Sequence, residues 1–167
     1  MRISACWAAL ALCTATWNVS AQLIDLDPDW KEVEIPAPPA FNPARLIPLE
    51  MPRFVSTKVG VDPETFRITS DGIVRYVVVA TSPGGNINAS YEGIRCQTGE
   101  VKIYARYGAT GKWNPMADPQ WKPLDGNQPS MHALVLARQG ACEGRSAASR
   151  SAAEIISKLK RPPQDHP

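Results

Sequence analysis

Residues 1–21 limit how much of this chain is left to fold and the redox conditions under which it folds. Arg2 supplies a positive start, and residues 3–16 are almost wholly apolar or small. Val19, Ser20 and Ala21 then place small side chains before the expected leader-cleavage site. This pattern is typical of a secretory leader that is removed on export. We expect cleavage after Ala21, which leaves enough chain for one domain in an oxidising compartment.

Neither a retained anchor nor a lipoprotein signal fits this leader as well. A membrane-spanning helix needs about 20 mainly apolar residues, whereas Asn18 and Ser20 interrupt this stretch. Lipid attachment prefers a small residue directly before the cysteine, but Leu12 precedes Cys13. We therefore expect no transmembrane span once the leader is removed.

Two of the four cysteines, Cys96 and Cys142, remain after cleavage. Two cysteines in an exported domain most simply form one disulfide, and chain-entropy reasoning gives a loop of this length about 4 kcal/mol of stabilisation. The alternative is a redox or nucleophilic cysteine. It lacks support, because there is no Cys-x-x-Cys motif and the nearest histidine, His132, is ten residues from Cys142. We predict a structural disulfide.

The charges are almost balanced. The whole chain has 18 basic and 16 acidic residues and a formal net charge of +2, and Arg2 is lost with the leader. Nucleic acid rewards dense clusters of Lys and Arg, and a membrane-binding patch needs a polybasic run. The sequence contains no long run of one sign, so we expect no nucleic acid partner.

Prolines dominate the segment that follows the leader. Because each proline removes a backbone donor and restricts φ, this segment can form neither a helix nor a central strand. We expect residues 22–52 to form an extended arm, partly in the polyproline II conformation. Interspersed apolar side chains favour an arm that packs over the domain; the alternative is a proline-rich ligand for a partner. The seven prolines are Pro28, Pro36, Pro38, Pro39, Pro43, Pro48 and Pro52.

Residues 53–107 have the pattern of an antiparallel meander. Asp71 and Gly72 predict a hairpin, because both residues accept the positive φ of a tight turn. The run 73–79 is apolar on both faces and is expected to be a central strand. The last strand, 101–107, alternates, which predicts one wet face at this edge. The expected inward residues are Val101, Ile103, Ala105 and Tyr107, and the expected outward residues are Lys102, Tyr104 and Arg106.

The chain becomes helical after residue 130, where apolar residues have helical spacing and Gly140 provides a stop. A second helix is expected from Ser151, which forms a capping box with Glu154. The sequence therefore predicts an α+β fold in one domain, residues 53–161. Its antiparallel sheet of about five strands is packed by two C-terminal helices, and a disordered tail follows over 162–167.

Metal and triad chemistry find little support. His132 has no second ligand at helical spacing, so we expect an ordinary helical histidine, no metal site and no cofactor. Ser130 and His132 would point apart on a helix, and no Gly-x-Ser-x-Gly motif occurs. Gly108 and Gly111 are too close together for a phosphate-binding loop.

Two pairs of carboxylates have spacing that could serve glycoside hydrolysis. They are Asp27 with Asp29 and Asp62 with Glu64. Both pairs lie beside prolines, where acidic residues commonly form turns. We interpret both pairs as turn formers and assign no catalytic residue.

Aromatic residues form the candidate binding group. Trp113, Trp121 and Tyr104 could build a platform for a sugar ring or a peptide, since indole faces suit such contacts and loops collect binding residues. The alternative, which we favour, is that both tryptophans cap the core beneath an irregular loop.

Several segments resemble the cryptic neisserial protein 1-like family. They are Trp30 to Glu32, the proline-rich arm, Phe54 to Gly60, Asp71 to Val79 and Tyr91 to Cys96. The resemblance covers roughly residues 28–140. It implies a small exported protein of Gram-negative bacteria, located in the periplasm or associated with the outer envelope. It brings no reaction and no catalytic residues to this chain.

We expect a non-catalytic envelope protein that binds a partner protein or a cell-wall component. The main alternative is a small carboxylate-dependent hydrolase that acts on envelope polymers. An enzyme would place two or more titratable groups with displaced pKa values in one cleft, whereas a binder would present apolar or aromatic surface without them. A third hypothesis is a structural subunit whose arm docks into a larger assembly.

Overall fold

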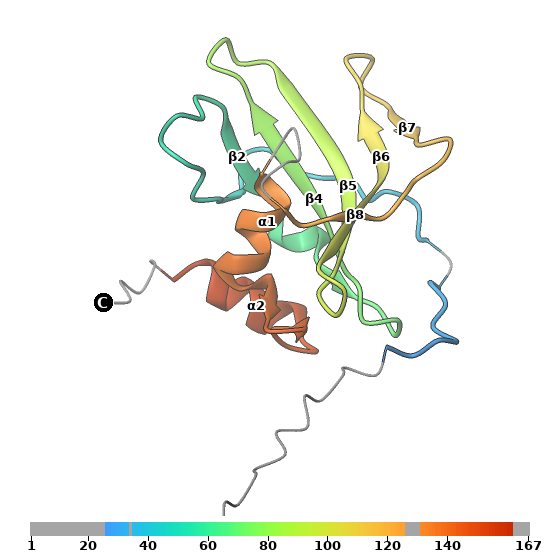
Figure 1. Cartoon of the computed structure of the whole chain (residues 1–167). Helices are drawn as coiled ribbons and strands as arrows, with labels where there is room; N and C mark the ends of the chain where they lie inside the picture. Colours follow the sequence, from blue (N-terminus) through green and yellow to red (C-terminus); the bar gives the residue numbers. More distant parts are fainter. Residues whose placement is uncertain (1–25, 34, 126–130, 162–167) are drawn as a thin grey trace, which may run out of the picture.

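The computed structural model describes residues 26–33, 35–125 and 131–161. The expected leader (1–21), the expected tail (162–167) and Ser130 lie outside the described residues. Helices, an antiparallel sheet and the arm form three layers: the helices lie on one face of the sheet, and the arm as far as Leu46 lies on the other (Figure 1). Ile47, Leu49 and Met51, at the end of the arm, pack on the helical face. This arrangement confirms the α+β class.

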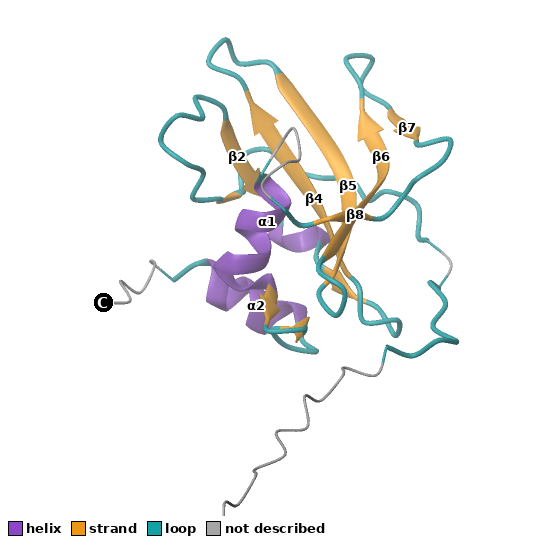
Figure 2. Cartoon of the chain, in the orientation of Figure 1, coloured by secondary structure: helices purple, strands orange, loops and turns teal. Residues whose placement is uncertain are grey.

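The sheet is antiparallel and has more strands than the five expected (Figure 2). Its main path runs β1-β2-β4-β5-β6-β7, with β3 paired to β4 and β8 paired to β6. The additional strands are two or three residues long and lie at the ends of the longer ones. The bounds are β1 Ile47–Pro48, β2 Lys58–Val61, β3 Arg67–Ile68, β4 Val74–Thr81, β5 Ile87–Arg95, β6 Glu100–Tyr107, β7 Trp113–Pro115 and β8 Lys122–Pro123.

Strand β4 is central, as the apolar run 73–79 predicts. It pairs with β2 and β3 on one side and with β5 on the other. Val74, Tyr76 and Val78 pack on the helical face, while Val77 and Val79 pack on the arm face. A strand that is buried on both faces needs apolar residues at consecutive positions, which explains the continuous run.

The helical layer is short. Helix α1 (His132–Leu136) continues into the π-helical turn η2 (Ala137–Ala141), which ends where Gly140 adopts a φ of 140°. Helix α2 spans Ala152–Leu159, and Leu136, Ile155 and Leu159 are buried in the same apolar cluster as the helical face of β4. The 3₁₀ turn η1 (Pro63–Thr65) and the hairpin of β9 (Cys142–Glu143) and β10 (Ser146–Ala147) complete this layer.

The capping box predicted for α2 is wrong. Ser151 is the N-cap residue, but its side chain makes no capping hydrogen bond. The side chain of Ser149 makes the local hydrogen bonds instead. Its Oγ accepts from the backbone N–H of Ser151 at 2.9 Å and donates to the carboxylate of Glu154. The sequence contains serines at both positions, and only the path of the preceding loop decides which one reaches Glu154.

The arm covers the second face of the sheet. Phe41 and Leu46 pack against the cluster formed by Val77, Val79 and Tyr91, and β1 within the arm pairs with β2. The expectation that Lys102 and Tyr104 face water is therefore wrong, whereas Arg106 is exposed as expected. The same contacts favour an arm that packs on its own domain.

A β-bulge explains why the simple alternation along β6 is wrong at Tyr104. Tyr91 pairs with Ala105, but the next residue, Glu92, pairs with Ile103, so Tyr104 is the extra residue. Such an insertion places two consecutive residues on one face. Tyr104 and Ala105 are both buried on the arm face, where Gly93 leaves room: a Cβ on it would meet the Tyr104 hydroxyl at 2.6 Å.

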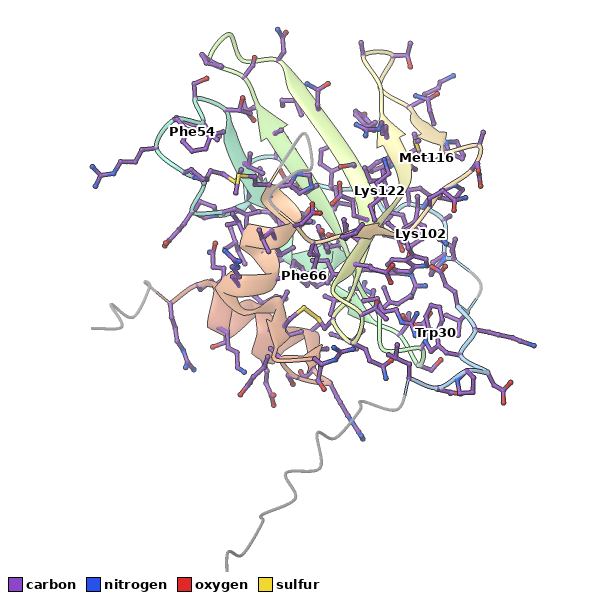
Figure 3. All side chains as sticks on the ribbon, viewed as in Figure 1. Trp30, Phe54, Phe66, Lys102, Met116 and Lys122 are labelled. Atoms are coloured by element: carbon purple, nitrogen blue, oxygen red, sulfur yellow. A yellow bond between two sulfur atoms is a disulfide. The ribbon has the colours of Figure 1, made fainter. Side chains whose placement is uncertain are left out.

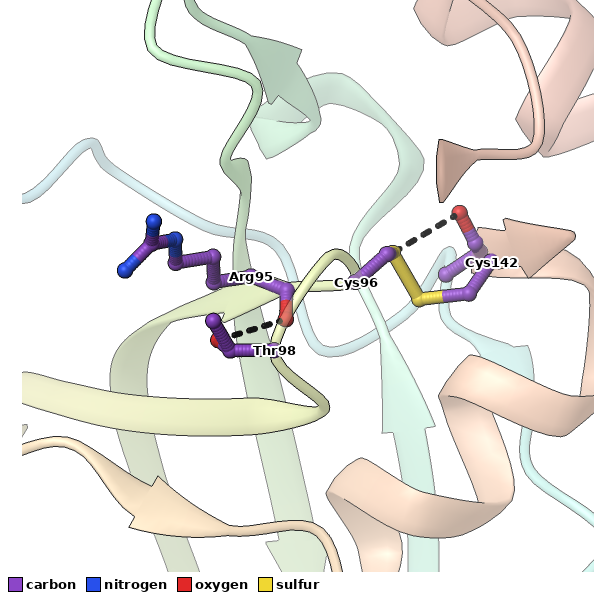
Figure 4. The surroundings of a disulfide bond; sticks show 5 residues. Arg95, Cys96, Thr98 and Cys142 are labelled. Carbon is purple, nitrogen blue, oxygen red and sulfur yellow. Dashed lines mark hydrogen bonds between the residues drawn. A yellow bond between two sulfur atoms is a disulfide. The ribbon is translucent and has the colours of Figure 1, made fainter. Parts of the chain in front are cut away.

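The predicted disulfide is confirmed. It joins Cys96, directly after β5, to Cys142 at the start of β9, with 5.7 Å between the two Cα atoms (Figure 4). The bond therefore links the end of a sheet strand to the segment that follows the first helix, as the sequence predicts.

Candidate functional site

Trp113 and Tyr104, two of the predicted platform residues, lie in contacts on the arm face. The Trp113 ring meets Phe41 and Tyr107 edge to face, with centroids 5.7 and 5.3 Å away. Tyr104 is only 5% exposed, and its hydroxyl donates to the Glu32 carboxylate at 2.6 Å.

Trp121, the third predicted residue, belongs to a different group. Its ring lies edge-on to Trp30 at 6.3 Å, and the Lys102 ammonium lies 5.1 Å from its centroid. Figure 3 shows Trp30 and Lys102 on the same side of the molecule. The three rings thus fall into separate groups that contact the arm, and their role in ligand binding stays a prediction.

The carboxylate pairs form turns, as interpreted from the sequence. Asp62 caps η1: its carboxylate accepts from the backbone N–H groups of Glu64 and Asn42 and from the guanidinium of Arg45. Asp27 accepts from the backbone N–H of Asp29 at 2.9 Å. Both oxygens of Asp62 and one oxygen of Asp27 accept local hydrogen bonds, which supports the interpretation as turn formers.

A buried charge cluster fastens the arm to the sheet; we call it the anchor cluster. The Arg75 guanidinium donates to Asp71 at 3.0 Å and to Glu32 of the arm at 3.2 Å. Glu32 also accepts from Lys102 at 2.6 Å, and the arm backbone at Val33 donates to Asp71. Arg75 has a fully buried side chain, and pairing of this kind offsets the desolvation of buried charges.

A cleft of about 360 Å³ opens beside β6. Strands β7 and β8 pair with opposite ends of β6, and the chain between them lines the outer side of the cleft with Met116, Asp118, Pro119 and Gln120. Val101 and Ile103 of β6 supply apolar surface, and Met116 faces them from the loop. Figure 3 shows Met116 and Lys122 on the same side of the sheet, and both residues line the cleft.

A buried ion pair lies at the cleft. The Nε2 atom of His132, at the start of α1, lies 2.8 Å from a carboxylate oxygen of Glu92 on β5. The Tyr76 hydroxyl donates to the same oxygen at 3.0 Å, and the Ser90 hydroxyl donates to the other oxygen at 2.5 Å. The Glu92 side chain is 1% exposed and the His132 side chain 14%, so the pair meets the cleft mainly through the imidazole.

Both pKa values move toward the charged forms. Burial, the strongest single influence, raises the pKa of Glu92, but the attraction of His132 and the three hydrogen bonds outweigh it and hold that pKa below its usual value. Burial likewise lowers the pKa of His132, yet the charge of Glu92 outweighs it and the pKa is raised. The contacts of the pair therefore favour the imidazolium form of His132 and the carboxylate form of Glu92.

Two further cations border the cleft, Arg106 of β6 and Lys122 of β8. Arg106 is close enough to oppose the positive charge on His132. Asp118 supplies a carboxylate in the outer wall. The cleft therefore combines an apolar floor with a positive side, which suits a ligand that has an apolar segment and an anionic group.

The arrangement does not match a nucleophilic triad. In a triad the imidazole accepts the proton of the serine, and the carboxylate orients the imidazole. Here Ser90 and His132 both donate to Glu92, so the carboxylate, and not the imidazole, holds the serine. Because its pKa is lowered, Glu92 is ionised near neutral pH and has no proton to donate as a general acid.

Sequence reasoning missed Glu92 and treated His132 as an ordinary helical residue. The available signal was the polar triple Ser90, Tyr91 and Glu92 inside a strand next to the core. An acidic residue in the middle of a strand is rare without a buried partner, and His132 was the only histidine inside the predicted domain.

The described residues contain no group of three or more His, Cys, Asp or Glu side chains placed to hold a metal ion. Among the helices within those same ranges, none combines the length and apolar character needed to cross a membrane.

The layered sheet and this cleft define an α+β domain with a preformed polar pair beside an apolar floor. The chain belongs to the CNP1-like family, whose model matches residues 25–160. This match confirms the family resemblance noted in the sequence. Comparisons with curated proteins and with solved structures found no match.

The ion pair predicts a pH-dependent stability. The contribution of His132 is fully present below its unfolded pKa of 6.5 and is lost as the pH rises through its raised folded pKa. The contribution of Glu92 is present above its unfolded pKa of 4.5 and is lost only as the pH falls through its lowered folded pKa. Urea unfolding from about pH 5 to 9 should therefore show that His132→Gln costs most near pH 5–6.5 and progressively less above. A cost that stays constant over this range would contradict the pair.

Proposed function

We propose that this protein is a non-catalytic binding module of the cell envelope, exported by its leader to the periplasm or the outer envelope. Its ligand site is the cleft beside β6, and its ligand is a cell-wall component that carries an apolar segment and a carboxylate. The observation that carries the proposal is the combination of an apolar floor with the Glu92–His132 pair in one open cleft.

The contacts support binding more than catalysis. Val101 and Ile103 offer apolar area on a rigid strand, while His132 and Arg106 offer positive charge. Because Glu92 already holds the imidazole, little side-chain freedom is lost when an anion arrives, which favours affinity. Glu92 itself has its carboxylate oxygens occupied by three donors.

Titration of the mature protein with soluble peptidoglycan fragments tests this proposal by calorimetry. We expect binding that weakens about tenfold or more in the double variant Arg106→Ala/Lys122→Ala, because charge-assisted contacts of about 1.5 kcal/mol each are lost. Both side chains are exposed, so the fold should persist. The matched control, Arg138→Ala/Lys160→Ala, removes the same charge from exposed positions on the helical layer and should bind normally. Failure of every fragment to bind would overturn the proposal.

One observation favours a hydrolase as the second candidate. Glu92 and His132 are two titratable groups with displaced pKa values in one cleft, which is the arrangement expected of an enzyme. In that case His132 would act as general acid toward the leaving group. Mass spectrometry of the incubated fragments decides between the two: cleavage that is abolished in His132→Gln would replace the binding proposal, and intact fragments would support it.

A further inference from the structure

A second and larger cavity, of about 610 Å³, lies away from the cleft. Three separate segments line it: the turn between β3 and β4 (68–72), the end of β5 with Gln97, and residues 145–150 around β10. None of these residues lines the cleft beside β6.

Three arginines border this cavity, which we call the arginine pocket. Arg95 comes from β5, and Arg145 and Arg150 come from the β9–β10 region. In the described part of the chain the ion pairs involve other cations, such as Arg45 and Arg75, and none of the three pocket arginines has an acidic partner there.

The single carboxylate in the lining does not neutralise these charges. Asp71 borders the pocket, but its oxygens accept from Arg75 at 3.0 and 3.2 Å and from the backbone of Val33. Arg75 balances that carboxylate, so the pocket keeps the three positive charges of its arginines. A concave site of one sign focuses the field on an ion of the opposite sign.

Arg95 is held in place for such an ion. Its guanidinium lies 3.5 Å from the centroid of the Trp30 ring, a stacked cation–π contact that fixes the planar group. Its Nε atom is buried and has no hydrogen-bond partner, and a buried N–H without a partner is costly. The planar fork of a guanidinium matches the oxygens of phosphate and carboxylate groups.

The disulfide holds the two sides of the pocket together. Cys96 follows Arg95 directly, and Cys142 lies three residues before Arg145 (Figure 4). The bond thus ties the β5 end of the lining to the β9–β10 hairpin. Hydroxyl groups of Ser70 and Ser146 add neutral donors between the charged segments.

We propose that the arginine pocket binds a small ligand with at least two phosphate or carboxylate groups. The cavity is larger than one such group needs, and three arginines from two segments suit several anionic groups on one molecule. This site is independent of the cleft, so either proposal can fail without the other.

Calorimetry with pyrophosphate and with citrate at constant ionic strength tests the pocket. The double variant Arg145→Ala/Arg150→Ala should weaken binding about tenfold or more, since charge-assisted contacts are removed. Both side chains are exposed, so folding should be retained. The matched control is Arg53→Ala/Arg138→Ala, which removes two exposed arginines elsewhere and should leave affinity unchanged.

A second experiment distinguishes a soluble anion from a lipid headgroup. It measures binding to phosphatidylcholine vesicles with and without cardiolipin. Binding of the free anions, lost in the pocket variant, supports a soluble ligand. Binding only to cardiolipin vesicles, lost in the same variant, supports a lipid headgroup. The proposal is overturned if neither experiment detects binding, or if both double variants lose the same amount of affinity.

Discussion

Replacing Arg75 by methionine is expected to lower the free energy of unfolding by about 3–5 kcal/mol, because it leaves a buried carboxylate without its cation. Asp71 is 1% exposed at its side chain and Arg75 is fully buried, so water cannot replace the lost partner. Glu32 keeps Lys102, which makes Asp71 the main source of the loss. Urea unfolding at neutral pH measures the effect. An unchanged dependence of the unfolding free energy on urea concentration checks that both proteins unfold in two states.

The double variant Arg75→Met/Asp71→Asn serves as the control for charge. This variant removes both members of the pair. Its loss of unfolding free energy should be smaller than the sum of the losses in the two single variants, because no unpaired charge remains. An Arg75→Met loss below about 1 kcal/mol, the range of an exposed pair, would show that the anchor cluster is not a buried ionic site.

Removal of the disulfide in Cys96→Ala/Cys142→Ala is expected to lower the free energy of unfolding by about 4 kcal/mol. The bond closes a long loop, with a sequence separation of 46, and so restricts the unfolded chain. Chemical denaturation of the oxidised wild type and of the double variant measures the difference. The same variant should also weaken anion binding at the arginine pocket, because the two sides of that pocket are joined by this bond.

Reduction of the wild type supplies the matched comparison for that double variant. The reduced protein and the double variant should have similar stabilities, since both lack the cross-link. Free thiols at Cys96 and Cys142 in the denatured, unreduced protein, or equal stability of oxidised and reduced forms, would contradict the prediction.

Much of the fold was accessible from local patterns. The apolar run 73–79 identified the central strand, and the Asp71-Gly72 turn identified the start of β4. Gly140 correctly marked the end of the first helix, where its φ of 140° is observed. These features succeed because strand burial and turn geometry depend on residues close together in sequence.

Which residues of β6 face the arm was harder to predict from the sequence. The alternation of residues 101–107 is real in the sequence, yet the bulge at Tyr104 shifts the pairing with β5. A bulge depends on how two strands are aligned in space, and no periodicity within one strand records that alignment. The cover supplied by the arm was similarly hidden, although its apolar residues indicated that it packs somewhere.

The candidate sites depend almost wholly on distant pairings. Glu92 and His132 are separated by 40 residues, and Arg75 and Glu32 by 43. Each of these side chains alone has an ordinary interpretation: a strand carboxylate, a helical histidine, a hairpin arginine. Only their convergence creates the cleft and the anchor cluster.

By itself the sequence determined the family resemblance, the antiparallel α+β class, the order of the main elements and the pairing of Cys96 with Cys142. These follow from hydrophobic periodicity, turn residues and cysteine number, all of which act locally or by counting. The tertiary structure alone decided which charges meet, which face the arm covers and where cavities remain. The physical reason is that buried charges and cavities are defined by neighbours across layers, and those neighbours are set by packing and not by sequence distance.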